Sequence, residues 1–361
     1  MSAPAAHPNA TPTAAKHAAR GWVVWRWRDL SLAWRPRQAA VVIALLATTA
    51  LVAAVAMTVG TFHVALADVF AILAGRGEGG VGERIVMNIR LPRVLAGIFA
   101  GAALGASGAV FQSVSRNALG SPDVIGFTTG AATGAISQIV LFGGGPNQVA
   151  AAAVIGGVLT AAVVYLLALK GGMVGGYRLL LTGIGVGAVL GALNGLLLVR
   201  GALDDAVNAN LWLAGSLNAR KWTHVYPVML GTLALVPLLA LGAKRLSLME
   251  MGDDLARQLG VAVERTRLLS VFGAVLLAAL ATAATGPIAF VALAAPQLVV
   301  RLGGRSDLPV IGAAAMGACL LVAADLLTQL APLGANLPIG RMTGVIGGVY
   351  LIWLLTRGRN L

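Results

Sequence analysis

Ten long apolar runs, separated by short polar segments, constrain this chain more than any other feature. A helix needs about 20 mostly apolar residues to cross a bilayer. Charged residues make up only 11% of the chain, against roughly 25% in a soluble domain. The sequence therefore predicts an all-α polytopic membrane protein with about ten transmembrane helices. The expected spans are 39–60, 92–112, 124–142, 148–169, 178–199, 224–243, 268–285, 287–302, 308–330 and 338–356.

The distribution of Lys and Arg predicts the orientation of these spans, because positive charge is enriched in cytoplasmic loops. If both termini are cytoplasmic, 18 of the 26 Lys and Arg residues lie inside. We therefore expect both ends of the chain in the cytoplasm. The net charge of +13 is then mainly a topology signal, and it gives no reason to expect nucleic-acid binding.

The chain divides into an N-terminal extension, residues 1–38, and a transmembrane domain, residues 39–361. The first twenty residues are rich in Ala, Pro, Thr and His, which predicts disorder. The stretch GWVVWRWRDLSLAWRPR follows, and its tryptophans and arginines suit the cytoplasmic membrane interface. We interpret the extension as cytoplasmic and its second half as an interfacial anchor.

The chain offers little chemistry for other classes of membrane protein. It has one cysteine, four scattered histidines and no GxxxxGK[ST] phosphate loop, so we expect no metal site, no cofactor and no enzymatic activity. Ion-coupled carriers place ionisable residues inside their spans. Here only Asp325 lies well inside an apolar run, where it would cap a broken helix or bind neighbouring backbone, and Asp123 lies at the edge of another.

Two apolar runs carry glycine at every fourth position. Residues four apart share one face of a helix, and small residues let a neighbouring helix approach closely. We expect tight packing along both stripes, with the lining of a transport pathway as the alternative. The stripes are Gly97, Gly101 and Gly105, and Gly183, Gly187, Gly191 and Gly195.

The longest expected cytoplasmic connection, residues 244–267, predicts an amphipathic hairpin of two short helices. Acidic residues open the first helix, where negative charge is favoured. Leucines give it an apolar face, and a glycine ends it. These residues are Asp253, Asp254, Leu255, Leu259 and Gly260. The hairpin suits docking of a partner, and a solvated loop is the alternative.

Five motifs occur in a fixed order along the chain. They are RLPR at 90–93, GAALGASGAVFQ at 101–112, RNALGSPDVIG at 116–126, GPIAFVALAAP at 286–296 and LPIGRMT at 337–343. Together they resemble the FecCD-type permeases, the transmembrane subunits of type II ABC importers for iron-siderophores, haem and vitamin B12. The resemblance covers residues 40–357 and implies a BtuC-like permease fold.

The resemblance also implies partners. Two permease subunits, the same or related chains, form a dimer, two ATP-binding subunits bind below it, and a periplasmic or lipoprotein substrate-binding protein docks above it. Residues 244–267 would then be the coupling element that enters a groove on the ATPase. Its candidate contacts are Asp253, Leu255, Ala256, Arg257, Leu259 and Gly260.

Docking of the binding protein is implied for Arg90 and Arg93, with headgroup anchoring as the alternative. Some relatives have a further arginine where this chain has Gln329, which leaves that third contact in doubt.

The resemblance places a cytoplasmic gate in the polar stretch 116–130. Its candidate residues are Asn117 and Leu119, facing Gly175, Gly176 and Tyr177. The family more often has small hydroxyl residues at the facing positions. Irregular backbone at membrane depth requires cover by protein or a water-filled cavity, and a gate provides that cover. A static loop is the alternative.

The expected function is import of a ferric siderophore across a bacterial inner membrane by ATP-driven alternating access. Gln297 replaces a histidine of many relatives and favours catecholate or other ferric-siderophore cargo. The same machinery carrying vitamin B12 or haem is the nearest alternative. An ion-coupled secondary carrier and a membrane assembly protein are the alternatives from other classes.

Overall fold

The computed structural model describes residues 23–27, 30–34, 36–77, 79–304, 309–331 and 337–357. The disorder that we expect for the first twenty residues falls outside this part of the chain. Two short strands precede the helices, β1 (Val23–Trp27) and β2 (Leu30–Trp34), and they pair antiparallel with Val23 opposite Trp34. The sequence did not predict this hairpin.

Each of the ten expected spans corresponds to a helix. These are α1 (Pro36–Thr58), α4 (Leu91–Ser115), α5 (Phe127–Phe142), α6 (Pro146–Ala168), α7 (Gly176–Arg200), α9 (Trp222–Glu250), α11 (Val263–Thr285), α12 (Val291–Gly303), α13 (Val310–Leu330) and α14 (Ile339–Arg357). Within the described residues, seven helices are long and apolar enough to cross a membrane, and α5 and α12 are shorter apolar helices. The predicted fold class is confirmed.

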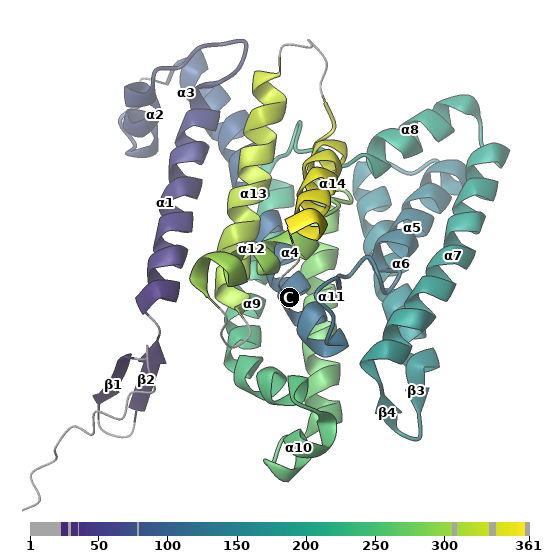
Figure 1. Ribbon diagram of the computed structural model, residues 1–361. Coiled ribbons are helices and arrows are strands. Elements are labelled where there is room, and N and C mark those ends of the chain that lie inside the picture. The colour runs from purple at the N-terminus through teal and green to yellow at the C-terminus, as the bar shows by residue number, and fades with distance from the viewer. Residues whose placement is uncertain are drawn as a thin grey trace, which may run out of the picture.

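The shorter elements mark the two ends of the helix bundle (Figure 1). At one end, which we call the α8 end, lie α2 (Leu66–Leu73), α3 (Val81–Ile85), the π-helical turn η1 (Val86–Arg90) and α8 (Leu203–Leu213). At the opposite end, the α10 end, lie α10 (Asp253–Gln258) and the hairpin of β3 (Leu169–Lys170) and β4 (Met173–Val174).

Two helices are longer than the hydropathy predicted. α9 continues to Glu250 instead of ending at 243, and α11 begins at Val263 instead of 268. The extra residues are mostly good helix formers that continue the hydrogen bonding of each helix beyond the apolar run. The expectation of two short helices in 244–267 is therefore corrected: α10 is the one separate helix there, between extensions of α9 and α11.

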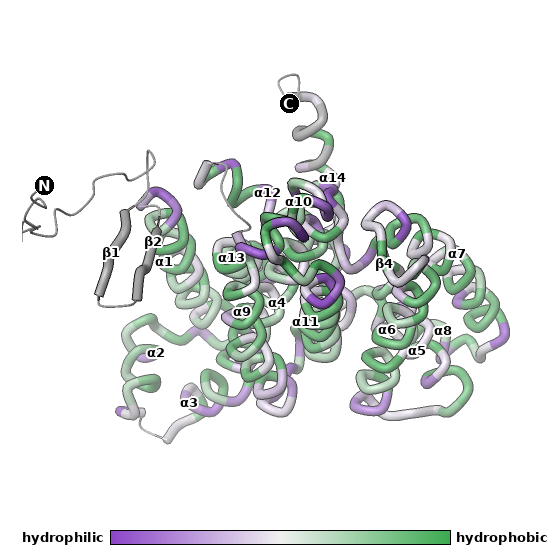
Figure 2. Tube along the Cα trace, turned by 90° about the horizontal axis from the view of Figure 1, so that it is seen from below, coloured by the Kyte–Doolittle hydropathy of each residue, from purple (hydrophilic) through white to green (hydrophobic). Residues whose placement is uncertain are grey.

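The long helix α4 lies at the centre of the bundle and is mostly buried. It packs against α9, α11, α12 and α13, while α1 covers α13 from outside. Seen from below, α5, α6, α7 and α8 form a second group on one side of α4 and α11, and α1, α2 and α3 lie on the other side (Figure 2). α4 therefore connects the two ends of the molecule through its core.

The glycine stripe of α4 packs directly against the backbone of α13. A Cβ atom added at Gly101 would lie 2.3 Å from the carbonyl oxygen of Gly317, and one added at Gly105 would lie 2.0 Å from that of Ala313. Only glycine allows this approach, so the expectation of tight packing is confirmed for α4.

The glycine stripe of α7 is packed in its first part and open in its second part. A Cβ atom at Gly183 would lie 2.5 Å from Cα of Ile125, whereas one at Gly191 or Gly195 would have no neighbour within 4 Å. The first part of this stripe packs inside the subunit, and the second part faces away from the described residues of the chain.

Candidate functional site

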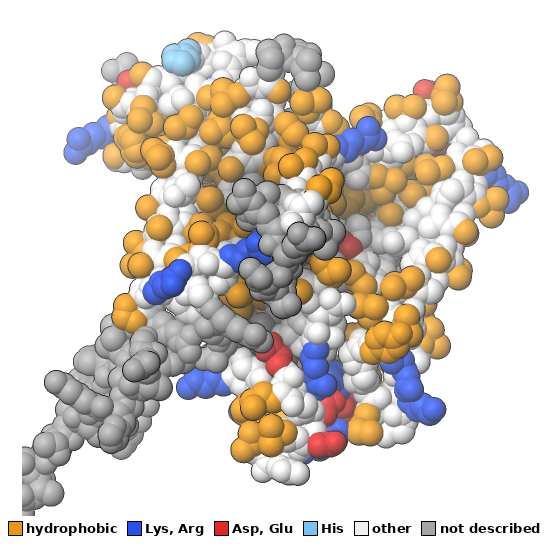
Figure 3. Space-filling model, in the orientation of Figure 1, with side chains coloured by type: hydrophobic (Ala, Val, Ile, Leu, Met, Phe, Trp, Pro, Cys, Tyr) orange, Lys and Arg blue, Asp and Glu red, His pale blue; other side chains and the backbone are white. Residues whose placement is uncertain are grey.

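Four charged side chains from three segments meet at the α10 end. Arg116 follows α4, Asp253 opens α10, and Glu264 and Arg267 lie in the first turns of α11. Figure 3 shows acidic and basic side chains gathered at this lower end, around α10 and the β3–β4 hairpin, below a largely hydrophobic middle. This cluster is the most connected polar region among the residues that the structure describes.

Asp253 is the centre of the cluster. Arg267 Nη2 donates to both of its carboxylate oxygens, at 2.9 and 2.8 Å, and Arg116 Nη2 donates to its Oδ1. Arg267 Nη1 also donates to Glu264 Oε1 at 2.6 Å. The Arg267 side chain is only 2% exposed, so its charge depends on these two carboxylates for compensation.

The network extends to two further segments. Arg116 Nε donates to the carbonyl oxygen of Met249, at the end of α9, at 3.0 Å. Glu264 Oε2 accepts the backbone N–H of Val174, in β4, at 3.3 Å. One connected set of bonds therefore joins the end of α9, α10, the start of α11, β4 and the segment that follows α4.

The polar segment 116–126, between α4 and α5, is not helical. Arg116 has a φ of 50° and ends α4 in the left-handed region, and Asn117 Oδ1 accepts the N–H of Leu119 at 2.9 Å. Much of the segment is buried, including Ser121 and Ile125, which gives the irregular backbone the cover that it needs at membrane depth. The hydroxyl of Thr128, in α5, donates a hydrogen bond to the carboxylate of Asp123.

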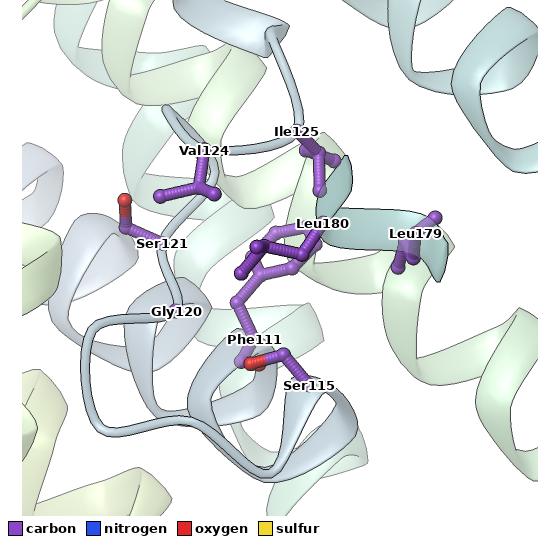
Figure 4. Close-up of a pocket in the computed structure, with 8 residues that line it drawn as sticks. All are labelled: Phe111, Ser115, Gly120, Ser121, Val124, Ile125, Leu179 and Leu180. Atoms are coloured by element: carbon purple, nitrogen blue, oxygen red, sulfur yellow. The ribbon is translucent and has the colours of Figure 1, made fainter. Parts of the chain in front are cut away.

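Of the predicted gate residues, Gly176 at the start of α7 packs against the end of α4, and Gly120 packs within the segment that follows α4. A Cβ atom at Gly120 would lie 2.3 Å from Ser115 Oγ, and one at Gly176 would lie 2.7 Å from the carbonyl oxygen of Val114. Figure 4 shows the same juxtaposition: side chains of α7 lie against the end of α4 and the segment after it. Leu119 and Tyr177 are large, exposed side chains at this place.

Gln297 of α12 contacts the same segment and bonds Gln112 of α4. Gln297 Nε2 donates to Gln112 Oε1 at 2.7 Å and lies 3.4 Å from the carbonyl oxygen of Ala118. Gln112 Nε2 in turn donates to the carbonyl oxygen of Leu293 at 3.0 Å. Gln297, which the sequence connected only with cargo, thus contacts the segment that follows α4.

α10 presents an apolar surface away from the bundle. Leu255 in the helix, and Met251 and Leu259 just before and after it, are exposed, whereas Ala256 is fully buried and faces its own chain. Gly260, with a φ of 82°, follows the helix. A cleft of about 820 Å³ lies between α10 and the start of α7 with the β3–β4 hairpin.

Arg257 is held at the rim of this cleft. Its Nη1 donates to Asp254 Oδ1 at 2.9 Å, on the same helix, and its Nη2 lies 2.9 Å from the sulfur of Met173. The predicted contacts of α10 are thus of two kinds: Leu255 and Leu259 face outward, and Asp253 and Arg257 are bonded within the chain.

At the α8 end, the two arginines that the sequence singled out both have partners within the chain. Arg93 Nε and Nη2 donate to the two carboxylate oxygens of Asp325, at 2.9 and 2.8 Å, and Gln329 Nε2 donates to the same carboxylate at 2.8 Å. Arg90 is buried and donates to the carbonyl oxygens of Met57, at 2.6 Å, and Phe62. A cavity of about 220 Å³ is lined by Arg90, Arg93 and Gln329.

The interpretation of Asp325 is corrected by this geometry. α13 is continuous from Val310 to Leu330, so Asp325 caps no broken helix, and the partners of its carboxylate are side chains of Arg93 and Gln329 rather than neighbouring backbone. A buried carboxylate is stable only with such compensation, and an arginine 232 residues away provides it.

Sequence reasoning missed the roles of Arg116, Glu264 and Arg267. Arg116 entered there only as a cytoplasmic charge and as the first residue of the motif RNALGSPDVIG, with no role of its own. Glu264 and Arg267 are three residues apart, a spacing that pairs side chains on a helix and was a usable signal. Within the described residues, no group of three His, Cys, Asp or Glu side chains is arranged to hold a metal ion.

Known proteins match this chain over most of its length. Residues 45–357 match the FecCD transport family. The chain is 45% identical over 296 residues to the ferric enterobactin transport system permease protein FepG of Escherichia coli K12, which covers 82% of this chain and 89% of that protein. It is 34% identical to the hemin transport system permease protein HmuU of Yersinia pestis, over 76% of this chain and 84% of that protein.

The fold has a solved counterpart as well. A transporter assigned to the metal-chelate ABC type, solved in an inward-facing conformation, matches with a TM-score of 0.78 at 25% identity. The match covers 88% of this chain and 99% of that one. With the family match over residues 45–357 and a relative that is 45% identical, this chain belongs to the FecCD transport family.

Proposed function

We propose that this chain is the permease subunit of an ABC importer that carries a ferric siderophore across the bacterial cytoplasmic membrane. The observation that carries the proposal is the 45% identity to a ferric enterobactin permease over 82% of the chain. The chain has no catalytic activity of its own, and two separate ATP-binding subunits supply the energy. A second permease subunit, identical or related, completes the pathway.

The α10 end is the cytoplasmic side in this proposal, and both chain termini are cytoplasmic. The excess of Lys and Arg on that side supports the orientation. Residues 1–38 are then a cytoplasmic extension at the membrane interface. The exposed apolar residues Met251, Leu255 and Leu259 form the surface that enters the ATP-binding subunit.

The gate is formed by the segment after α4 together with the start of α7. Asn117, Leu119, Gly175, Gly176 and Tyr177 of the two permease subunits close the pathway on the cytoplasmic side. The contact of Gly176 with the end of α4 and the exposure of Leu119 and Tyr177 support this assignment. The small residues allow the backbones to approach closely when the gate is shut.

The α8 end receives the substrate-binding protein. Arg93 is the main docking residue, because its side chain is still 22% exposed although it is paired with the Asp325 carboxylate. An acidic side chain of the binding protein can enter the cavity beside it. Arg90 supports the same surface by fixing the turn between Met57 and Phe62, and a direct contact requires it to release those carbonyl oxygens.

The experiment is uptake of radiolabelled iron, offered as several ferric siderophores, in a strain that lacks this gene. The wild-type gene should restore uptake of one chelate. If every iron chelate enters the deletion strain normally, the siderophore assignment fails. The same strain is then tested with haem, which the hemin permease relative favours, and with cobalamin.

A further inference from the structure

We infer, on the basis of the proposed function, that Asp253 and Arg116 are the link through which the coupling helix α10 moves the cytoplasmic gate. They act as positioning residues: neither touches cargo, and each holds one part of the machinery to another. The bond between the Arg116 guanidinium and the Asp253 carboxylate joins the segment after α4 directly to the first residue of α10.

Arg116 is bonded to both α10 and the end of α9, next to the coupling surface. Its Nη2 bonds Asp253 in α10, and its Nε bonds the carbonyl oxygen of Met249, at 3.0 Å, where α9 ends. A displacement of α10 by the ATP-binding subunit therefore pulls on the residue that precedes Asn117 and Leu119. A solvated loop without such bonds would not transmit the movement.

The backbone at Arg116 favours this role over simple chain termination. Arg116 ends α4 in the left-handed region, with a φ of 50°, where helices usually place glycine because a side chain is unfavourable there. Glycine would end α4 more easily. Glycine, however, has no guanidinium group to bond Asp253. Arg116 therefore accepts an unfavourable backbone conformation and supplies the side chain that makes the link.

The second lip of the gate belongs to the same network. Asp253 also receives Arg267, at 2.9 and 2.8 Å, and Arg267 holds Glu264, which accepts the N–H of Val174 at 3.3 Å. Val174 immediately precedes Gly175 and Gly176. Movement of Asp253 is thus transmitted to both lips, through Arg116 to one and through Arg267 and Glu264 to the other.

The neighbouring acid provides a matched control. The Asp254 side chain is 94% exposed and pairs with Arg257 of the same helix, whereas the Asp253 side chain is 27% exposed and joins three segments. Asp253→Asn and Asp254→Asn remove the same charge at adjacent positions. Arg116→Gly removes the link and at the same time relieves the left-handed backbone, so we expect it to fold as wild type does.

The test uses the whole transporter, with its ATP-binding subunits and binding protein, in lipid vesicles. ATP hydrolysis and cargo delivered per ATP are measured for wild type, Arg116→Gly, Asp253→Asn and Asp254→Asn. We expect Arg116→Gly and Asp253→Asn to hydrolyse ATP but to deliver less cargo per ATP. The decrease should be at least about fivefold, which is the lower end of the usual coupling between two sites. Asp254→Asn should match wild type.

A second readout does not depend on the identity of the cargo. Spin labels are placed at Ala118→Cys and Gln258→Cys, two exposed positions, in a Cys319→Ala background. In wild type the distance between the labels should stay the same with and without ATP, because both segments move together. In Arg116→Gly it should change when ATP binds.

The inference is overturned if Arg116→Gly delivers as much cargo per ATP as wild type, or if its label distance stays constant with ATP. It is also overturned if Asp254→Asn uncouples transport as strongly as Asp253→Asn. If wild type hydrolyses ATP and keeps the label distance but carries no ferric siderophore, the cargo assignment fails and the label comparison still decides the link.

Discussion

At the scale of single residues, the pair of Arg93 and Asp325 determines what the α8 end can do. Asp325 is 4% exposed in the middle of a helix, and Arg93 reaches it with two parallel hydrogen bonds. Such bidentate pairs fix the geometry of both side chains. The carboxylate therefore holds the arginine in one position, at the edge of a cavity that opens beside it.

Removing one member of this pair should cost more than removing both. Asp325→Ala leaves Arg93 without its partner, which costs about 3–5 kcal/mol for a fully buried pair and less here, because Arg93 is 22% exposed. The double variant Arg93→Leu with Asp325→Leu should be more stable than Asp325→Ala. Thermal unfolding of the purified subunit in detergent measures both, and a double variant less stable than the single one would contradict the account.

Docking of the binding protein should depend on the charge of Arg93. The double variant Arg93→Gln with Asp325→Asn removes that charge without leaving a buried carboxylate alone. We expect it to weaken docking more at low salt than at high salt, because screening reduces the contribution of exposed charges. Asp325→Asn alone frees Arg93 and should retain docking or strengthen it. An equal loss at all salt concentrations would exclude an electrostatic role.

At the scale of helices, the most demanding contact is that of α4 with α13. Their backbones touch at Gly101 and Gly105, so the position of one helix fixes that of the other. The spacing of glycines in the sequence predicted a smooth face, but it did not identify α13 as the neighbour. A second stripe with the same spacing, in α7, is open at Gly191 and Gly195.

The two stripes make a matched prediction. Gly105→Ala places a methyl group against the carbonyl oxygen of Ala313 and should destabilise the subunit by about 1–3 kcal/mol, the usual range for overpacking. Gly191→Ala meets no atom within 4 Å and should stabilise α7 by about 0.5–1 kcal/mol. Unfolding of the two purified variants compares them, and equal effects would show that the close contact does not matter.

The exposed face of α10 should be required for binding of the ATP-binding subunits. Leu255→Ala with Leu259→Ala should lower that affinity at least about tenfold, because burial of each leucine contributes about 1.5–3 kcal/mol and a tenfold change is 1.4 kcal/mol. Leu203→Ala, an exposed leucine of α8 at the opposite end, is the control. Binding measured in nanodiscs that is unaffected by the double variant would remove α10 from the interface.

The sequence predicts where the long helices lie better than it predicts which residues contact one another. Because the length of a span and its hydropathy are local properties, the apolar runs located the ten helices that match the expected spans, but not the short helices α2, α3 and α8. The ends of α9 and α11 lie in polar sequence, where hydropathy gives no signal. The pairs that build both sites join residues far apart, 232 positions for Arg93 and Asp325 and 137 for Arg116 and Asp253. Their contact depends on how α4 packs, which the pattern of one segment does not specify.

At the scale of the whole molecule, α4 connects the two functional ends. Arg93 lies in its first turn, and Arg116 follows its last residue, Ser115. A helix of 25 residues spans roughly 37 Å at a rise of 1.5 Å per residue, which is more than the thickness of the hydrocarbon core. The central, buried helix thus reaches from the proposed docking surface to the proposed gate.

The central claim is that transport of a ferric siderophore through this chain is driven by ATP hydrolysis in a separate subunit. The most direct test is uptake of a labelled ferric siderophore into vesicles that contain this permease, its ATP-binding subunits and its binding protein. Uptake should require ATP, stop when the ATP-binding subunit is made inactive, and continue when a protonophore removes any ion gradient. Uptake that a protonophore abolishes while ATP is held constant would contradict the account and indicate an ion-coupled carrier.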